Sequence, residues 1–238
     1  MSIGEIYNLS QRLGEMKRGH EYPGAFVVLE GCDGTGKSTQ YRKLLVDLAS
    51  RYPDKKVTEV REPGGTEIGE RIRDILLDPI HTEMTLEAEF LLYSASRGQL
   101  TRQRIIPALK RNEIVLADRF YPSTWAYQGA AGGLFQKGKF EWEDFMQLQD
   151  LATSRTRPDL TAIFDVSPEI AQTRLNPLLD RMEQKGREFF EKVRAGYHDY
   201  SRRCQEKAVI ISAEPPPDVV YPELHRAVFN FLDEIGYK

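Results

Sequence analysis

The sequence is poor in cysteine, in long apolar runs and in excess charge of either sign. Two cysteines among 238 residues, Cys32 and Cys204, are too few for a disulfide framework. No apolar stretch approaches the roughly 20 residues that a membrane-spanning helix requires. The formal charge is -3, from 33 basic and 36 acidic residues, so it indicates neither a nucleic-acid partner nor a membrane partner. A reducing cytoplasm is the expected compartment.

What the sequence does contain is an alternation of short apolar runs and amphipathic helical periods. Apolar runs without alternation, such as residues 114–117, are typical of strands that helices cover on both faces. We therefore predict an α/β fold, a doubly wound five-stranded parallel sheet with helices on both faces. The predicted strands are residues 25–30, 57–60, 114–118, 160–165 and 209–212.

Residues typical of helix starts, and apolar residues at helical spacing near the N-terminus, indicate where the domain begins. Ser167, Pro168 and Glu169 form a cap, a first-turn proline and a favourable acid. Apolar residues recur at helical spacing over residues 3–16, before a break around Gly19 and Pro23. We predict a helical extension over residues 1–22 and one domain over residues 23–238. The extension either packs on its own domain or forms a dimer or partner contact.

A glycine-rich loop follows the first predicted strand. Residues 31–39 read GCDGTGKST, which matches the phosphate-binding pattern G-x-x-x-x-G-K-[ST] between a strand and a helix. Gly31, Gly34 and Gly36 allow backbone amides to surround phosphate oxygens at a helix N-terminus. The order of strand, loop and helix predicts a P-loop NTPase-like fold that binds ATP.

Side chains of this loop supply the charge and the metal contact. Lys37 brings a mobile positive charge, and Ser38 offers a hydroxyl to the Mg²⁺ that accompanies ATP. Cys32 is either a small buried side chain, the commoner role, or a thiol whose pKa the helix terminus lowers. The predicted ATP-binding residues of the loop are Gly31, Cys32, Asp33, Gly34, Thr35, Gly36, Lys37, Ser38 and Thr39.

An Asp-Arg-Phe sequence ends the third predicted strand, at the sheet edge where doubly wound folds bind ligands. Asp118 can assist Mg²⁺, and Arg119 can hold a phosphate. The alternative is a surface ion pair between the two residues. Because such a pair seldom ends an entirely apolar strand, we predict Asp118 as a metal residue and Arg119 as a catalytic and substrate-binding residue.

Several motifs together resemble the bacterial thymidylate kinases. They are the P-loop, REPGGT at 61–66, the DRF, ST and YQ positions at 118–128, RPDL at 157–160 and DRMEQ at 180–184. The resemblance spans residues 25 to about 235. It implies an ATP-dependent thymidylate kinase that transfers the γ-phosphoryl group of ATP to dTMP, giving dTDP and ADP for dTTP synthesis. It also implies Mg²⁺ as cofactor and a homodimer.

The resemblance further implies how dTMP is bound. Asp33 is expected to meet its 3′-hydroxyl, since a carboxylate accepts from that donor. Tyr93 and Arg97, four residues apart on one helical face, are expected to stack on thymine and to contact its polar edge or the phosphate. By periodicity alone they would be a core aromatic and a solvated charge. The full implied set is Asp33, Glu62, Pro63, Tyr93, Arg97, Arg119, Ser123, Thr124, Tyr127 and Gln128.

Individual members of that set have narrower expected roles. Thr124 corresponds to a position that hydrogen-bonds the thymine edge. Tyr127 and Gln128 correspond to the lining of the deoxyribose pocket, where a tyrosine could exclude a ribose 2′-hydroxyl. The Glu62–Pro63 bond lies in the substrate-side loop and is a candidate for the cis form.

A second cationic element is expected in a lid over residues 174–187. Family members without a basic residue in the P-loop supply one from the lid, and this loop has Gly34 and Thr35 at that place. Arg181 is the predicted catalytic cation, beside Lys37 and Arg119, because arginine fingers contribute about 10³ to 10⁵ in turnover. Arg174 is predicted to bind ATP, and Arg174 and Lys185 are predicted to be supporting contacts beside Arg181. The alternative is a solvated, charged loop.

Two departures from the family and two rival functions qualify this interpretation. Phe120 replaces the commoner tyrosine or histidine, and residues 175–180 contain less arginine than many related lids. One rival is a deoxynucleoside kinase, which would need an acid near Glu62 as a base for a 5′-hydroxyl. The other is a catalytically silent nucleotide-binding protein, since fold alone does not establish function.

Overall fold

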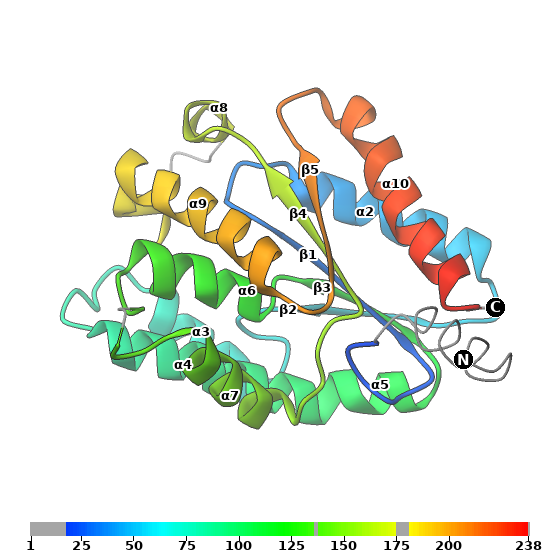
Figure 1. Ribbon diagram of the computed structural model, residues 1–238, viewed down its shortest axis with the longest axis horizontal. Helices are drawn as coiled ribbons and strands as arrows, with labels where there is room; N and C mark the ends of the chain where they lie inside the picture. Colours follow the sequence, from blue (N-terminus) through cyan, green and yellow to red (C-terminus); the bar gives the residue numbers. More distant parts are fainter. Residues whose placement is uncertain (1–17, 136–137, 175–180, 238) are drawn as a thin grey trace, which may run out of the picture.

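A parallel sheet forms the centre of the molecule, with the strand order β2-β3-β1-β4-β5 (Figure 1). The computed structural model describes residues 18–135, 138–174 and 181–237. All neighbouring strands are parallel, which confirms the predicted doubly wound sheet. The strands are β1 (Ala25–Gly31), β2 (Val57–Arg61), β3 (Ile114–Asp118), β4 (Leu160–Asp165) and β5 (Lys207–Ser212), so the predictions differ only at the ends of β1, β2 and β5.

One face of the sheet is covered by α2 (Lys37–Arg51) and α10 (Pro217–Glu234) (Figure 1). Leu44 and Leu48 recur at a spacing of four on α2 and are fully buried. They pack with Leu224 of α10 and with alternate residues of β1, β3 and β4 in one apolar core.

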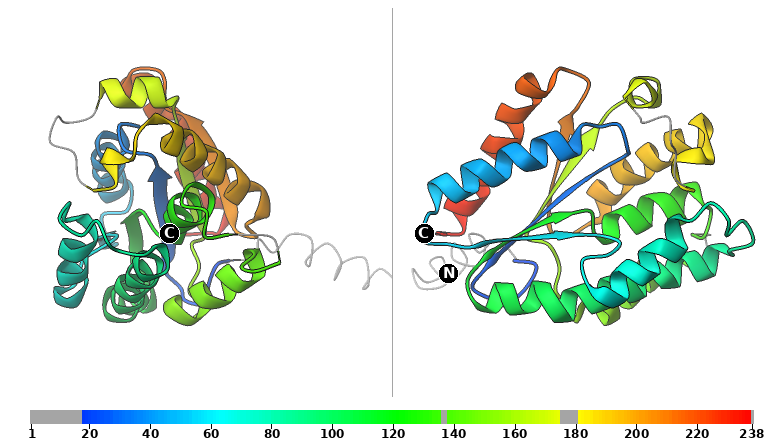
Figure 2. Two further views of the ribbon diagram at one scale, coloured as in Figure 1. Left: turned by 90° about the vertical axis from the view of Figure 1, so that its left-hand side faces the viewer. Right: turned by 180° about the vertical axis from the view of Figure 1, so that it is seen from behind.

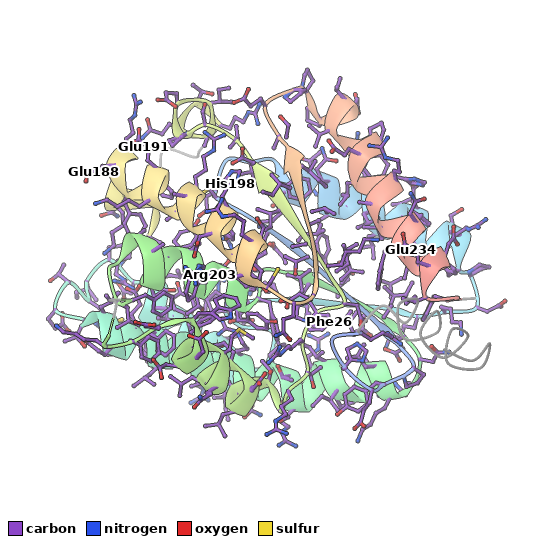
Figure 3. The ribbon with its side chains drawn as sticks, in the orientation of Figure 1. Phe26, Glu188, Glu191, His198, Arg203 and Glu234 are labelled. Atoms are coloured by element: carbon purple, nitrogen blue, oxygen red, sulfur yellow. The ribbon has the colours of Figure 1, made fainter. Side chains whose placement is uncertain are left out.

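The opposite face carries a larger group of helices (Figure 2). Its apolar core includes Phe26 and Val28 of β1, which point away from α2, because successive strand residues face opposite sides. Figure 3 labels Phe26 in the interior of the molecule. The helices are α3 (Glu67–Leu77), α4 (Leu86–Leu100), α5 (Ile106–Lys110), α6 (Tyr121–Thr124), α7 (Trp142–Thr153) and α9 (Arg187–Arg203), with π-helical segments η1 (Thr101–Ile105) and η2 (Trp125–Ala131).

The predicted lid lies between α8 (Pro168–Thr173) and α9. Ser167 caps α8 by accepting a hydrogen bond from the backbone N–H of Ile170 at 3.5 Å, with Pro168 as the first helical residue, as predicted. Lid residues 175–180 lie outside the described residues. A short 3₁₀ turn, η3 (Glu183–Lys185), precedes α9.

Residues just before β1 are tied to the domain through Asp159. The Asp159 carboxylate accepts hydrogen bonds from the backbone N–H groups of Gly19 and Phe26, at 3.0 and 2.9 Å. It also pairs with Arg18. Residues 18–22 thus pack on the domain whose predicted start is residue 23. The predicted helix over residues 3–16 lies outside the described residues.

Candidate active site

The P-loop follows the carboxyl end of β1, the central strand, which has a neighbouring strand on each side. Gly34 and Gly36 have φ angles of 81° and 80°, in the left-handed region that favours glycine. A Cβ atom on Gly34 would lie 2.3 Å from the carbonyl oxygen of Ala171. The loop therefore requires glycine at position 34 for its conformation and for its close approach to α8.

The loop ends in the N-terminus of α2, with Gly36 as the N-cap. No side chain of the described residues caps this helix, so its first backbone N–H groups remain available to an anion. The buried Lys37 side chain begins α2, and its Nζ donates to Asp118 Oδ1 at the end of β3. This end of the sheet thus combines a helix terminus with a lysine and a carboxylate.

The predicted metal residues, Ser38 and Asp118, fit a magnesium site. Ser38 is exposed at the start of α2, and the Asp118 side chain is 33% exposed and already pairs with a cation, the ammonium of Lys37. The described residues contain no cluster of three or more His, Cys, Asp or Glu side chains that could hold a metal. A hydroxyl and one carboxylate suit Mg²⁺, which is usually bound by one or two protein oxygens together with substrate phosphates.

The remaining P-loop side chains stabilise the loop itself. The hydroxyl of Thr35 donates to the carbonyl of Cys32 at 2.9 Å. The backbone N–H of Thr39 donates to the carbonyl of Gly36 at 3.0 Å. Burial raises the pKa of the Cys32 thiol to about 12, so the thiol is protonated at neutral pH. Of the two interpretations of Cys32, the structure favours the small buried side chain.

A cavity opens beside the P-loop and brings together every residue of the predicted substrate-binding set. They come from the ends of β1, β2 and β3, from α4 and α6 and from the π-helical segment η2. The lining residues are Asp33, Glu62, Pro63, Arg73, Leu77, Tyr93, Arg97, Arg119, Phe120, Ser123, Thr124, Tyr127, Gln128 and Met182. Because the P-loop supplies Asp33 to this lining, the cavity lies next to the predicted ATP site.

Arg119 and Asp33 form the polar centre of the cavity. Arg119 Nη2 donates to Asp33 Oδ1 at 2.6 Å, and the hydroxyl of Tyr127 donates to Asp33 Oδ2 at 3.3 Å. Although burial opposes ionisation of Asp33, the charges of Arg119 and Lys37 hold the pKa of its carboxyl below the usual value. Arg119 therefore pairs with Asp33 of the P-loop, and Asp118 pairs with Lys37. Asp118 and Arg119 thus do not form the surface ion pair that was the alternative explanation for this motif.

A buried carboxylate, Glu30, fixes the turn that carries Arg119. Glu30 Oε1 accepts from the backbone N–H of Phe120 at 2.7 Å, and Oε2 accepts from Ser123 at 2.6 Å and from Tyr197 at 3.0 Å. Arg119 itself has a φ angle of 69°, an uncommon conformation for a residue with a side chain. Burial raises the pKa of Glu30, against the charge of Arg119. Sequence reasoning missed Glu30, although an acid within an apolar strand is a signal for such a role.

Arg97 occupies a second polar centre and is only 1% exposed. Its Nε donates to Glu62 at 3.0 Å, its Nη2 to Thr124 at 2.7 Å and its Nη1 to Gln149 of α7 at 2.6 Å. Burial raises the pKa of Glu62 to about 7, although the charge of Arg97 opposes this. Arg97 is not the solvated charge that periodicity alone suggested, and Gln149, a partner of Arg97, carries no sequence signal.

The substrate-side loop after β2 contains a cis peptide bond between Glu62 and Pro63, which confirms the candidate for that isomer. The backbone N–H of Gly64 donates to Ser96 Oγ at 3.1 Å. Arg73 Nη1, from α3, donates to the carbonyl of Pro63 at 2.9 Å. These contacts hold the loop against α3 and α4, and they identify Arg73 as a cavity residue that the motifs did not predict.

The described lid residues contact two different sides of the site. Arg174 donates to the carbonyls of Ala213 and Glu214 after β5, at 2.8 and 2.9 Å. Arg181 Nε donates to the carbonyl of Leu76 at the end of α3 at 2.8 Å. Lys185 lies 5.8 Å from the centre of the Phe189 ring. Arg181 is thus held on the cavity side, and Arg174 beside the loop that follows β5.

Comparison with known proteins gives consistent matches over most of the chain. A family model described as thymidylate kinase matches residues 29–224. A thymidylate kinase of Desulforudis audaxviator (strain MP104C) is 45% identical over 192 residues, covering 80% of this chain and 84% of that protein. A thymidylate kinase of Exiguobacterium sp. (strain ATCC BAA-1283 / AT1b) is 41% identical over 215 residues, covering 90% and 98%. Among the described residues, no helix has the length and apolar character needed to cross a membrane.

Proposed function

The chain belongs to the thymidylate kinase family, and from this premise we propose that it transfers the γ-phosphoryl group of ATP to dTMP, giving dTDP and ADP. The observation that carries the proposal is the cavity beside the P-loop, whose lining contains every residue expected to bind dTMP. A nucleotide-binding loop alone would support many functions. A loop that shares Asp33 with a preformed second pocket supports transfer between two nucleotides.

The donor half of the reaction rests on the P-loop. The free N–H groups at the start of α2 and the ammonium of Lys37 would bind the β- and γ-phosphates of ATP. Arg174, next to the loop after β5, would contribute to the same nucleotide. Ser38 and Asp118 would hold Mg²⁺, which when bound neutralises charge on the phosphates.

The acceptor half rests on the two polar centres of the cavity. Arg119 would bind the phosphate of dTMP, while Asp33 would accept a hydrogen bond from its 3′-hydroxyl. Tyr93 would stack on thymine, and Arg97 with Thr124 would present polar groups to the base edge. Because hydrogen bonds to Glu62 and Gln149 hold Arg97 in place, the groups that recognise the base would be positioned before dTMP binds.

The chemical step itself requires positioning and positive charge. The attacking atom is a phosphate oxygen that is already anionic, so no general base has to remove a proton. The two polyanionic substrates repel each other, and negative charge is redistributed in the transition state. We assign stabilisation of this transition state to Lys37, Arg119 and Arg181.

An acceptor panel tests this proposal. The purified chain with ATP and Mg²⁺ should release ADP, measured by a coupled assay, with dTMP as acceptor and far more slowly with dUMP, dGMP or thymidine. Turnover with thymidine but not with dTMP would indicate a deoxynucleoside kinase. No turnover with any acceptor, despite ATP binding, would indicate a silent nucleotide-binding protein.

We also propose that the chain is a homodimer. The helices α3, α4 and α7 pack side by side, and each exposes a large apolar side chain: Ile68 is 53% exposed, Leu91 57% and Leu151 78%. Exposed apolar side chains on neighbouring helices favour a protein partner, and the family resemblance makes a second copy of the chain the expected one. Light scattering should give the mass of a dimer for the wild type and of a monomer for Leu91→Glu. A wild-type monomer would contradict the proposal.

The two cysteines support a cytoplasmic location. Both are free thiols, as expected in a reducing compartment.

A further inference from the structure

A buried carboxylate, Glu89 on α4, connects the cavity wall to Arg181. Its Oε1 accepts a hydrogen bond from Gln128 Nε2 at 2.7 Å, and its Oε2 accepts from Arg181 Nη2. The Glu89 and Arg181 side chains are only 6% and 11% exposed. No motif points to Glu89, yet it contacts two residues of the predicted site at once.

Arg181 is fixed by a second element as well as by Glu89. Its backbone N–H donates to the carbonyl of Leu77 at 3.4 Å, and its Nε donates to the carbonyl of Leu76 at 2.8 Å. Both carbonyls belong to the last turn of α3, where helix carbonyls lack intrahelical partners and attract cations. The guanidinium is therefore held by α3 and α4 together.

The contacts around Glu89 adjoin the acceptor pocket directly. Gln128, Leu77 and Met182 all line the cavity. Met182 follows Arg181 in the chain, and Gln128 is bonded to the other oxygen of the carboxylate that holds Arg181. A change in the position of Gln128 or of Met182 would therefore change the position of Arg181 through one or two contacts.

Stability alone gives little reason for this ion pair. The desolvation of two charges offsets much of their attraction, and well-packed apolar residues are often as stable at such places. The pair is almost fully buried and links the cavity residue Gln128 to the predicted catalytic residue Arg181. Orientation of the guanidinium is a reason for such a pair that stability does not supply.

We propose that Glu89 is a positioning residue for the phosphoryl transfer: it orients the guanidinium of Arg181 and links it, through Gln128, to the acceptor pocket. This inference rests on the proposed function, because it assigns Glu89 a role through Arg181. Glu89 touches no reacting atom, so its removal should affect turnover more than it affects the binding of either nucleotide.

Substitution of Glu89 by glutamine removes the charge while keeping an oxygen that can accept from Gln128. The turnover number kcat should fall on the order of tenfold to hundredfold, as for small displacements of a catalytic group. The KM values for dTMP and ATP should change less than about threefold, since uniform binding is retained. Glu87→Gln, on the exposed side of the same first turn of α4, is the matched control and should leave kcat unchanged.

A double-mutant cycle with Arg181→Gln separates positioning from a structural role. If Glu89 acts through Arg181, then Glu89→Gln should have no further effect on kcat in the Arg181→Gln background. An equal loss in both backgrounds would overturn the proposal, and so would an unchanged kcat for Glu89→Gln alone. Thermal unfolding checks the fold of each variant. If Glu89→Gln does not fold, Glu89→Asp takes its place in the cycle, with a smaller loss expected because the charge is kept.

The wild type distinguishes failure of this inference from failure of the proposed function. Wild-type turnover of dTMP with additive losses in the cycle would overturn the role of Glu89 alone. Absence of wild-type turnover would overturn both.

Discussion

The P-loop and the neighbouring cavity are built in opposite ways. The P-loop is one continuous stretch, residues 31–39, that uses backbone conformation and the start of α2. The cavity draws side chains from strand ends, from helices and from a π-helical segment. The first region exposes Ser38 and part of Asp118, whereas the second buries the Arg97 and Glu62 pair almost completely.

The difference extends to how positive charge is held. Three arginines on the cavity side each pair with a carboxylate: Arg119 with Asp33, Arg97 with Glu62 and Arg181 with Glu89. Such pairs keep cationic groups oriented before any ligand arrives, which is the condition for electrostatic preorganisation. The P-loop offers backbone dipoles and one lysine, Lys37, which pairs with Asp118. The comparison predicts that substitutions in the two regions differ in size and in kind.

The largest effect is expected at Arg181. Arg181→Ala should lower kcat about 10³-fold, because the P-loop carries no basic residue at Gly34 or Thr35 that could replace it. The KM for dTMP should change less than about threefold. Steady-state kinetics would measure both values, with Arg202→Ala on the exposed part of α9 as the control. An unchanged kcat would assign the transferring cation to another residue.

A somewhat smaller loss is expected at the donor side. Lys37→Met should lower kcat about 10²- to 10³-fold, the range for loss of one preorganised donor in the transition state. Binding of dTMP, followed by calorimetry without ATP, should be almost unaffected because Lys37 contacts Asp118 rather than the cavity wall. Lys43→Met, on the same helix but paired at the surface, is the control. A large loss of dTMP affinity would mean that the two regions are not separable in this way.

Arg119 should behave differently from Lys37, since it belongs to both regions. Arg119→Gln should lower kcat/KM for dTMP about 10²-fold or more. It should also destabilise the chain by about 1 to 3 kcal/mol, because the partly buried Asp33 carboxylate loses its partner. Denaturant unfolding measures the second effect. A variant as stable as the wild type would show that Asp33 does not depend on this pair.

The smallest effect concerns the pH dependence of stability, where the two regions should have opposite signs. The pKa of Glu62 is raised to about 7, so its contribution is present below about pH 4, its unfolded value, and is lost as pH rises to about 7. The pKa of Asp33 is lowered, so its contribution is present above about pH 4 and is lost as pH falls below that.

Glu62→Gln tests this sign directly. The wild type should lose on the order of 1 to 3 kcal/mol of unfolding free energy from Glu62 between about pH 4 and 7. The variant, although less stable overall because Arg97 loses a charged partner, should show a flatter profile over this range. Glu59→Gln, at an exposed position of β2, should keep the wild-type slope. A steeper profile for Glu62→Gln would contradict the assigned direction.

The comparison also explains how much the sequence could predict. The P-loop is local: its glycines, Lys37 and Ser38 carry the information within one motif, and the strands are readable as apolar runs. The cavity is not local. That Arg97 meets Gln149, or that Glu89 meets Arg181, depends on the packing of helices far apart in the chain, which no periodicity records. The family resemblance supplied the cavity residues, but it did not supply the partners that orient them.

The same limit explains the residues that sequence reasoning missed. Glu30 could be suspected because an acid stands in an apolar strand, whereas Arg73 and Glu89 look like ordinary charges on helices until α3 and α4 are placed together. Arg119, with its positive φ, precedes Phe120, whose backbone N–H donates to Glu30. Such a contact is formed by tertiary structure and not by local preference.

Isotope transfer tests whether the P-loop and the cavity are the two halves of one site that transfers a phosphoryl group from ATP to dTMP. ATP that carries heavy oxygen in its γ-phosphoryl group would be incubated with the chain, Mg²⁺ and dTMP, and the products analysed by mass spectrometry. The products should be dTDP with the label in its β-phosphoryl group, together with unlabelled ADP. Label found in inorganic phosphate, with dTMP unchanged, would contradict it.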